Sequence, residues 1–248
     1  MRPSDSWIVP DWPAPTHVRA VSTTRIGGVS AAPFDSFNCG DHVGDAAENV
    51  RENRRFLATK LGLKNEPLWL RQVHGVHVAN HVTPNDICEA DAAISTQAHQ
   101  PCVVMTADCL PVLLCDRAGS AVGVAHAGWR GLLNGVIETT VDAMQRPAQQ
   151  LLAWLGPAIG PAHFEVGDDV YNAFAQARPE SMHAFRAGRA GHWYADIFEL
   201  ARYALLRRGI VAVYGGGICT YSEKTRFFSF RRDGRTGRMA TVIWMEEK

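Results

Sequence analysis

The chain has 248 residues, of which 46% are hydrophobic and 20% are charged. This composition excludes a disordered chain, and the length allows one domain over residues 1–248 to bury a full core without a disulfide or a metal. Twenty-five basic residues balance twenty-five acidic ones, so no global electrostatic field attracts nucleic acid or an anionic membrane. We expect neither of them as a partner.

The first thirteen residues contain tryptophans, aspartates and prolines, and they lack the basic segment and apolar run of a secretory signal. No apolar stretch approaches the roughly 20 residues that a membrane helix needs. The cysteines are scattered and form no C-x-x-C pair: Cys39, Cys88, Cys102, Cys109, Cys115 and Cys219. These features predict a cytoplasmic protein with reduced thiols. The balanced charge and the lack of a free amphipathic stripe favour a monomer.

Segments rich in β-branched residues recur along the chain, and turn residues separate them. We expect strands over His17–Thr24, Leu68–Val73, Ala92–Thr96, Cys102–Thr106, Val112–Cys115, Ala121–Ala125, Leu151–Leu155, Val211–Tyr214, Phe227–Phe230 and Ala240–Trp244.

Longer segments have the hydrophobic period of helices. They are 45–61, 132–144, 168–177 and 196–209. Asp45, with Glu48 three residues later, has the pattern of a capping box at the start of the first helix. Pro147 stops the second helix, and Gly209 is a natural C-terminal residue for the last one. The mixed order of strands and helices argues against a doubly wound parallel sheet. It predicts a single α/β domain, α+β-like in its layering, with a large mixed β-sheet.

Three segments place a metal-ligating side chain beside glycine or proline at the end of a predicted strand. They are Gln72–Gly75, Thr106–Pro111 and His126–Gly131. Rigid strand ends are where protein sites are commonly built. The imidazoles of His74 and His126 and the thiolate of Cys109 suit zinc, and three protein ligands leave the fourth tetrahedral position to water or substrate. Zinc bound in this way lowers the pKa of water to about 7.

Other interpretations of these three residues stay open, because their separations of 35 and 17 positions match no local metal motif. Cys109 has the character of a small buried hydrophobe, and His126 that of a hydrogen-bonded histidine at a strand end. A third interpretation is a metal-free pair, in which the Cys109 thiolate is the nucleophile and His126 is its base.

Several arginines and one glutamate are candidates for contacts with an anionic substrate. Arg25 precedes a glycine pair that would let the backbone approach a ligand, although a plain turn explains the pair equally well. Arg130 precedes a predicted helix, so its guanidinium and the helix N-terminus could meet at one anion. Arg231 lies in a basic turn that solvation alone would explain. Glu165 follows a stiff Gly–Pro loop and is a possible general base.

Longer motifs that run through nearly the whole chain carry a resemblance to a known family. In chain order they are STTR-x-GGVS from Ser22, Pro33-Phe34, Asn38, HVGD from His42, QVHG from Gln72, TADCLP from Thr106, HAGWRG from His126, LGPAIGP from Leu155, Glu165-Val166-Gly167 and FFSFRRDGRTGRMA from Phe227. The chain resembles the bacterial YfiH/YlmD-type proteins. These have been described as laccase-domain or multicopper polyphenol oxidase proteins, and their human relative is a laccase-domain purine-nucleoside enzyme.

The resemblance implies a layered domain of the toxin-deamidase type with one zinc per chain. The zinc ligands of the family fall on His74, Cys109 and His126. The implied reactions are the phosphorolysis of adenosine, inosine, guanosine or methylthioadenosine and the deamination of adenosine. Asp108 or Glu165 would then handle the proton, with Cys109 at the reacting centre. The residues expected to contact nucleoside or phosphate are Arg25, Asn38, Gln72, Arg130 and Arg231.

Two other functions remain as alternatives. Some members of the family resemble amidases that correct a peptidoglycan precursor carrying serine in place of alanine, of the UDP-MurNAc-L-Ser type, which would make a muropeptide precursor the substrate. A non-enzymatic binding module is the second alternative. Laccase chemistry is not expected, because a multicopper oxidase needs several His-x-His pairs and this chain has none. Copper could still occupy a two-histidine, one-cysteine site adventitiously.

Overall fold

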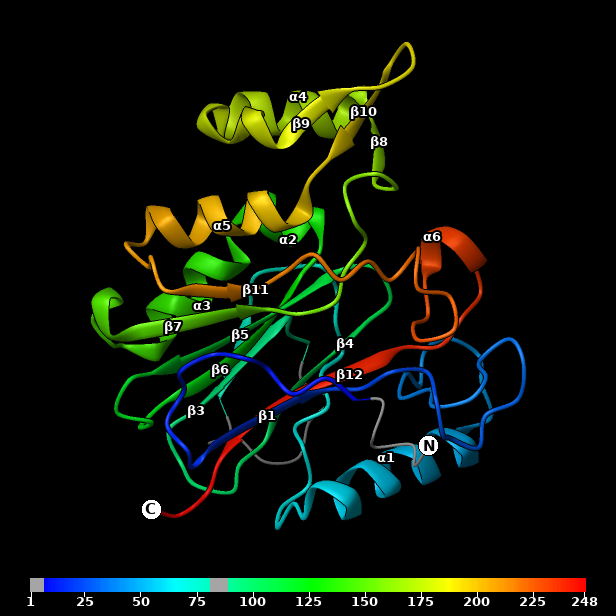
Figure 1. Ribbon diagram of the computed structural model, residues 1–248, viewed down its shortest axis with the longest axis vertical. Helices are drawn as coiled ribbons and strands as arrows, with labels where there is room; N and C mark the ends of the chain where they lie inside the picture. The colour runs from blue at the N-terminus through cyan, green and yellow to red at the C-terminus, as the bar shows by residue number, and fades with distance from the viewer. Residues whose placement is uncertain (1–6, 81–88) are drawn as a thin grey trace.

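The computed structural model describes residues 7–80 and 89–248. Two parts of the sequence discussed above lie outside the described residues. They are Met1–Ser6, at the start of the N-terminal segment, and Cys88. The fold is mixed α/β, as the sequence predicts, and it is built in layers (Figure 1). The strands are β1 (Val18–Ser22), β2 (Val78–Asn80), β3 (Ala92–Ser95), β4 (Cys102–Thr106), β5 (Leu110–Asp116), β6 (Val122–Ala127), β7 (Leu151–Leu155), β8 (Glu165–Gly167), β9 (Phe185–Ala187), β10 (His192–Ala195), β11 (Val213–Gly215) and β12 (Met239–Met245).

The helices come between strands in chain order. They are α1 (Ala47–Leu61), α2 (Trp129–Asn134), α3 (Val136–Met144), α4 (Asp168–Ala177), α5 (Ile197–Arg207) and α6 (Phe230–Asp233), with short 3₁₀ turns at Ala148–Gln150 and Pro179–Ala184. No helix in the described part of the chain is long and apolar enough to cross a membrane.

The largest sheet has six strands in the order β11-β7-β5-β6-β3-β2. Its outer pairs, β11 with β7 and β2 with β3, are parallel, whereas the pairs in the middle are antiparallel, so the expected mixed sheet is confirmed. Its central strands are apolar on both faces. In β5, Val112 and Leu114 pack on one side while Leu113 and Cys115 pack on the other, which the two-residue period of a strand requires.

Helices cover one face of this sheet and a second sheet covers the other. Helices α2, α3 and α5 join the core cluster on the first face. The three-stranded sheet β1-β12-β4 packs on the opposite face and shares a core with it. Helix α1 in turn covers the outer face of the three-stranded sheet through Leu57. The result is a helix–sheet–sheet–helix stack, with β4 and β6 in contact across the middle.

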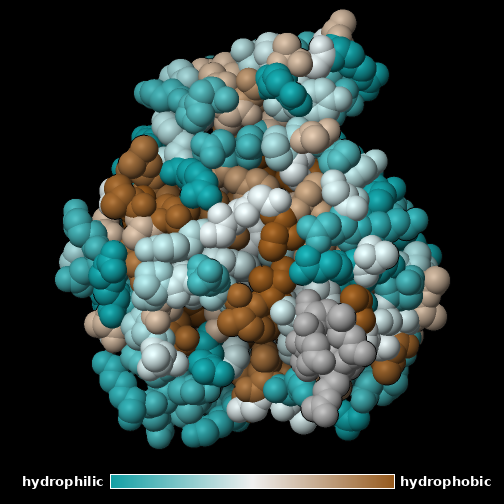
Figure 2. Space-filling model, viewed as in Figure 1, coloured by the Kyte–Doolittle hydropathy of each residue, from teal (hydrophilic) through white to brown (hydrophobic). Residues whose placement is uncertain are grey.

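A small lobe stands at one end of the molecule and consists of α4 with the sheet β8-β10-β9 (Figure 1). Tyr171 of α4 stacks on Trp193 of β10 with ring centroids 3.6 Å apart. Figure 2 shows that this lobe is largely polar on the viewed face, whereas apolar surface gathers over the C-terminal part of α5. There Leu206 and the following Val211 are exposed.

The structure corrects several boundaries expected from the sequence. Leu68–Val73 makes isolated bridges instead of a continuous strand, and residues 227–229 form a buried irregular segment that leads into α6. The helix expected over 132–144 is divided at Gly135, whose φ of 98° ends α2 and precedes α3. At α1, Ala46 is the N-cap, because the Asp45 carboxylate is hydrogen-bonded to the Asn38 side chain and the Ala46 N–H instead.

Candidate metal centre

His74, Cys109 and His126 lie together although they are far apart in the chain. Their ligand atoms are all within 4.8 Å of one another, and the group could hold a metal ion. We refer to these three side chains as the ligand cluster. His126 lies near the end of β6 and pairs with Pro111 of β5, and Cys109 immediately precedes that strand. Antiparallel pairing of β5 with β6 therefore brings the thiol and one imidazole to the same edge of the sheet.

His74 reaches the ligand cluster from a loop that Asp91 holds in place. The two Asp91 carboxylate oxygens accept backbone N–H groups from Val73, His74 and Gly75 at 2.6–3.1 Å. One of these oxygens also accepts the Nδ1–H of His126 at 2.8 Å, which leaves Nε2 of His126 to face the cluster. His74 itself adopts a φ of 59°, an uncommon conformation for a residue other than glycine. Asp91 thus couples the two histidines.

The dimensions of the ligand cluster fit a tetrahedral zinc. Two protein ligands on one zinc, a histidine nitrogen and a cysteine sulfur, lie about 3.5 Å apart. Nε2 of His74 and Sγ of Cys109 are 3.9 Å apart, so a small side-chain adjustment suffices. Gly128 makes room for this arrangement. A Cβ atom at position 128 would lie 3.0 Å from both Cys109 Sγ and His74 Cδ2.

The electrostatics of the ligand cluster favour the thiolate form of Cys109. Burial raises the pKa of the Cys109 thiol, but the charges and hydrogen bonds of His126 and His74 outweigh this effect and lower the pKa to about 6. Burial lowers the pKa of His126, whereas the Cys109 thiolate and Asp91 raise it to about 9. A metal ion binds the thiolate form of cysteine. Binding of a metal at His126 would release the imidazolium proton.

The ligand cluster opens into a cavity of about 420 Å³. Its apolar walls come from Met105, Ala107, Trp129, Ile159, Phe164, Ile197 and Phe230. Its polar walls come from His42, Gln72, Thr106, Asp108, Arg130, Arg231 and Arg238. A cavity of this size suits a small organic molecule that is mostly buried when bound.

Besides Cys109 of the ligand cluster, four of the residues expected to contact or transform substrate line this cavity. They are Asp108, Gln72, Arg130 and Arg231. Asp108 is buried with a φ of 90°, and its carboxylate accepts hydrogen bonds from Thr220, Ser229 and the Arg231 N–H. The Gln72 amide exchanges two hydrogen bonds with the backbone of Met105, which joins the His74 loop to β4. Asp108 and Gln72 therefore also organise the cavity wall.

The other expected contact residues do not line the cavity. Arg25 forms an ion pair with Asp35 and faces a separate groove. Asn38 is buried, where its amide bridges Gly40 and Asp45 and accepts the N–H of residue 238. The Glu165 carboxylate pairs with Arg189, and this interaction holds its pKa below the ordinary value.

The sequence patterns did not predict a role at this centre for Asp91 or Arg238. Asp91 comes directly before the apolar strand β3, and a charged residue against a buried strand is the signal that could have revealed it. Arg238 belongs to the basic segment that follows the expected strand Phe227–Phe230. Nothing in this segment distinguishes it from its neighbours Arg232 and Arg235. Only the three-dimensional packing places Arg238 on the cavity wall.

Comparisons with known proteins agree over nearly the whole chain. The profile of the family described as "Multi-copper polyphenol oxidoreductase laccase" matches residues 19–246. The chain is 52% identical to a purine nucleoside phosphorylase of Pseudomonas aeruginosa, over 98% of this chain and 100% of the relative. It is 49% identical to the purine nucleoside phosphorylase YfiH of Escherichia coli, over 96% of this chain and 98% of the relative.

Solved structures show the same fold. A Neisseria meningitidis protein superposes with a TM-score of 0.95 at 47% identity, covering 98% of this chain and 100% of that one. YlmD from Geobacillus stearothermophilus superposes with a TM-score of 0.86 at 34% identity, covering 94% of this chain and 93% of that one. The family expected from the motifs is therefore confirmed, and the chain belongs to the multi-copper polyphenol oxidoreductase laccase family, together with the YfiH and YlmD proteins.

Proposed function

We propose that this protein is a zinc-dependent purine nucleoside phosphorylase. The observation that carries the proposal is the ligand cluster itself, which opens into a cavity with both apolar rings and guanidinium groups on its walls. Relatives about half identical to this chain are named purine nucleoside phosphorylases, which supports the same activity here. The substrates are a purine nucleoside, namely adenosine, inosine, guanosine or methylthioadenosine, and inorganic phosphate.

The cavity walls suit the two parts of a nucleoside. Trp129, Phe164 and Phe230 supply aromatic surface, and flat purine bases stack well on such rings. Phe230 is 58% exposed, so one of its faces is available to a ligand. The ribose and the phosphate need hydrogen-bond donors, and the arginines that lie beside these rings provide them.

In phosphorolysis a phosphate oxygen forms a bond to C1′ of the ribose while the bond from C1′ to the base nitrogen breaks. The base leaves with a proton, and ribose 1-phosphate is the second product. Zinc held by His74, Cys109 and His126 would act as a Lewis acid and would make water more acidic. The cavity arginines hold phosphate against C1′, and Asp108 is the proposed group that handles the proton because it lies on the cavity wall beside Cys109.

Adenosine deamination is the second reaction that we assign to this centre. It replaces the amino group at C6 of the base with oxygen from water and releases ammonia, and it needs no phosphate. Cys109 contributes as a metal ligand in both reactions. Glu165 remains the alternative proton carrier, although its ion pair with Arg189 would have to open for this role.

The test separates the two reactions by their need for phosphate. Purified protein loaded with zinc is incubated with each nucleoside, with and without phosphate, and the products are separated by chromatography. We expect free base and the sugar 1-phosphate only with phosphate, namely ribose 1-phosphate, or methylthioribose 1-phosphate from methylthioadenosine. We expect inosine from adenosine in either case. A protein that forms no free base from any of these nucleosides in the presence of phosphate and zinc would contradict the proposed function.

An amidase acting on a muropeptide precursor is the second candidate, and one observation favours it. Asp91, His126 and Cys109 form a hydrogen-bonded series in which a carboxylate orients an imidazole beside a thiolate, as in cysteine hydrolases. Such an amidase would release an amino acid and would keep its activity after chelation of metal. Treatment with a chelator, followed by assay on UDP-MurNAc-L-Ser and on nucleosides, distinguishes the two functions. Laccase chemistry is not proposed, because the sequence has no His-x-His pair.

A further inference from the structure

The cavity beside the ligand cluster contains guanidinium groups that lack a carboxylate partner. Many arginines of this chain form ion pairs, such as Arg25 with Asp35 and Arg232 with Asp233. Within residues 7–80 and 89–248, by contrast, no ion pair involves the three arginines on the cavity wall, which are Arg130, Arg231 and Arg238. An unpaired guanidinium in a partly enclosed cavity attracts an anion strongly, because the local dielectric constant is lower than in water.

The negative charge on the same wall does not cancel these cations. Asp108 is the one carboxylate among the described residues that line the cavity. Its oxygens accept hydrogen bonds from the hydroxyl groups of Thr220 and Ser229 at 2.6 and 3.0 Å and from the Arg231 N–H at 2.7 Å. These hydrogen bonds orient the carboxylate, and the cavity wall carries three guanidinium groups against this one carboxylate.

Arg238 is held in a fixed orientation with part of its guanidinium free. Its Nη1 donates to the backbone carbonyls of Thr236 and Gly237, each at 3.0 Å. Its backbone N–H donates to the buried side chain of Asn38 at 2.8 Å. Its Nε and Nη2 groups have no hydrogen-bond partner among the described residues, so two parallel donors remain available. A guanidinium edge of this kind binds phosphate oxygens in pairs.

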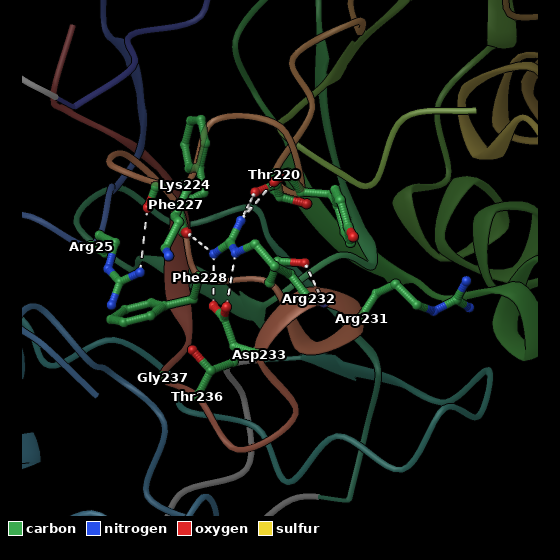
Figure 3. Close-up of polar contacts among 12 residues, drawn as sticks. Arg25, Thr220, Lys224, Phe227, Phe228, Arg231, Arg232, Asp233, Thr236 and Gly237 are labelled. Atoms are coloured by element: carbon green, nitrogen blue, oxygen red, sulfur yellow. Dashed lines mark hydrogen bonds and ion pairs between the residues drawn. The ribbon is translucent and has the colours of Figure 1, made fainter. Parts of the chain in front are cut away.

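Arg231 is held in the same way as Arg238, through hydrogen bonds from one end of its guanidinium to backbone carbonyls. Its Nη1 donates to the backbone carbonyls of His163 and Glu165 at 3.3 and 2.7 Å, while its Nε and Nη2 bind no described residue. Figure 3 shows that Arg231 extends away from Arg232. The guanidinium of Arg232 donates hydrogen bonds to Asp233 and to backbone carbonyls. Arg130 differs, because its guanidinium contacts the ring of Trp129 and no hydrogen bond to a described residue fixes its orientation.

The geometry points to a phosphate subsite formed by Arg231 and Arg238, which bind the oxyanion through their free guanidinium edges next to the ligand cluster. The bound chemistry is a phosphate dianion, and we assign it to inorganic phosphate as co-substrate, an assignment that rests on the proposed phosphorolytic function. The phosphoryl group of a nucleoside 5′-phosphate is the other source of the same chemistry. Because backbone carbonyls already fix both arginines, binding costs little side-chain entropy.

The electrostatics of Arg238 agree with its location beside the ligand cluster. Burial lowers the pKa of Arg238, and the charges of Cys109 and Asp108 act in the opposite direction, so the guanidinium lies within electrostatic reach of both. Asn38 belongs to this subsite as a positioning residue. It carries no contact to the cavity, but its side chain fixes the backbone of Arg238.

The test measures phosphate binding directly, by equilibrium dialysis of radiolabelled inorganic phosphate against the zinc-loaded protein. We expect Arg238→Gln and Arg231→Gln each to weaken phosphate binding by about 10- to 100-fold, because a hydrogen bond to a charged group contributes about 1.5–3 kcal/mol. Arg235→Gln is the matched control, because Arg235 belongs to the same loop but donates to Gly44 outside the cavity. Unchanged phosphate affinity in Arg238→Gln and Arg231→Gln would overturn the assignment.

Two further measurements make the result specific. The KM for phosphate should rise by the same factor in the two variants while the KM for the nucleoside changes less than about threefold. Adenosine 5′-monophosphate is dialysed in parallel. If the variants lose affinity for the nucleotide but keep full affinity for phosphate, the oxyanion belongs to the nucleotide and the co-substrate assignment is wrong.

Different results would contradict the phosphate subsite and the proposed phosphorolysis. If phosphate binding depends on Arg231 and Arg238 but the wild type releases no base, the subsite stands and phosphorolysis does not. If the wild type releases base and both variants bind phosphate normally, phosphorolysis stands and the subsite is wrong. Thermal unfolding and zinc content are measured for each variant. The exposed Arg231 carries the test should Arg238→Gln fold poorly.

Discussion

The carboxylate of Asp91 accepts the Nδ1–H of His126 at 2.8 Å, and both side chains are almost completely buried. The same carboxylate accepts the backbone N–H groups of the loop that carries His74. One residue therefore sets the orientation of one metal-ligating imidazole and the position of the other. A carboxylate behind a histidine ligand also increases the basicity of the ligand.

We predict that Asp91→Asn lowers zinc affinity by about 10- to 100-fold, since partners behind a metal ligand commonly have effects of this size. The amide has one acceptor oxygen where the carboxylate has two, so at least one of the present donors loses its partner. Chelator competition measures the affinity. Asp116→Asn is the control, because Asp116 is equally buried at the far end of β5. Equal zinc affinity in the two variants would contradict the role of Asp91.

A second prediction concerns the space at Gly128. Its φ of −73° is allowed for any residue, so Gly128→Ala tests sterics alone. The new Cβ would lie 3.0 Å from Cys109 Sγ and from His74 Cδ2, which must move apart. We expect zinc affinity to fall by about tenfold or more with a small change in unfolding temperature. At Gly75 an added Cβ lies 3.5 Å from its nearest neighbour, so Gly75→Ala should retain the metal.

Removal of a ligand should abolish metal retention. We expect about one zinc per chain in the wild type purified without added metal, and none in Cys109→Ala, by mass spectrometry. Cys219→Ala is the matched control, because Cys219 is also a partly buried free thiol but lies outside the ligand cluster. A Cys109→Ala protein that is fully active without metal would end the zinc hypothesis, and one that keeps its zinc would show that Cys109 is not a ligand. A wild type without metal would favour the cysteine-hydrolase alternative.

The fourth prediction concerns stability and pH at Asp116. Burial raises the pKa of this carboxyl, but hydrogen bonds from Ser120 and the Ala121 N–H, with the charge of Arg146, hold it below its ordinary value. Its contribution is therefore complete above the unfolded-state pKa and is lost as the pH falls through the lower folded-state pKa.

At neutral pH we expect Asp116→Asn to reduce the free energy of unfolding by about 2 kcal/mol, the usual scale for hydrogen bonds to a charged group. The difference from the wild type should shrink below about pH 4, where the Asp116 carboxyl of the unfolded chain begins to take up a proton. Urea unfolding across this range measures it. A difference that stays constant from neutral pH to about pH 3 would show that the charge of Asp116 does not stabilise the fold.

Much of the fold was predictable because its patterns are local. Strands such as Cys102–Thr106 and Leu151–Leu155 are short apolar runs between turns, and the structure has both with the expected bounds. The break at Gly135 was not predicted, since the apolar stripe continues through it and only the φ of 98° ends the helix. The small sheet β8-β10-β9 was also not predicted, because its strands are short and partly exposed.

By itself, the sequence identified His74, Cys109 and His126 as candidate metal ligands, because each follows an apolar run close to glycine or proline and belongs to a motif that resembles the family. It did not determine which polar residues accompany them. Asn38 contacts residue 238 across 200 positions, and Asp91 contacts His126 across 35. Such contacts depend on the pairing of strands and the packing of two sheets, which leave no periodic pattern along the chain. For this reason only the tertiary structure placed Arg238 in the cavity and Arg25 and Glu165 outside it.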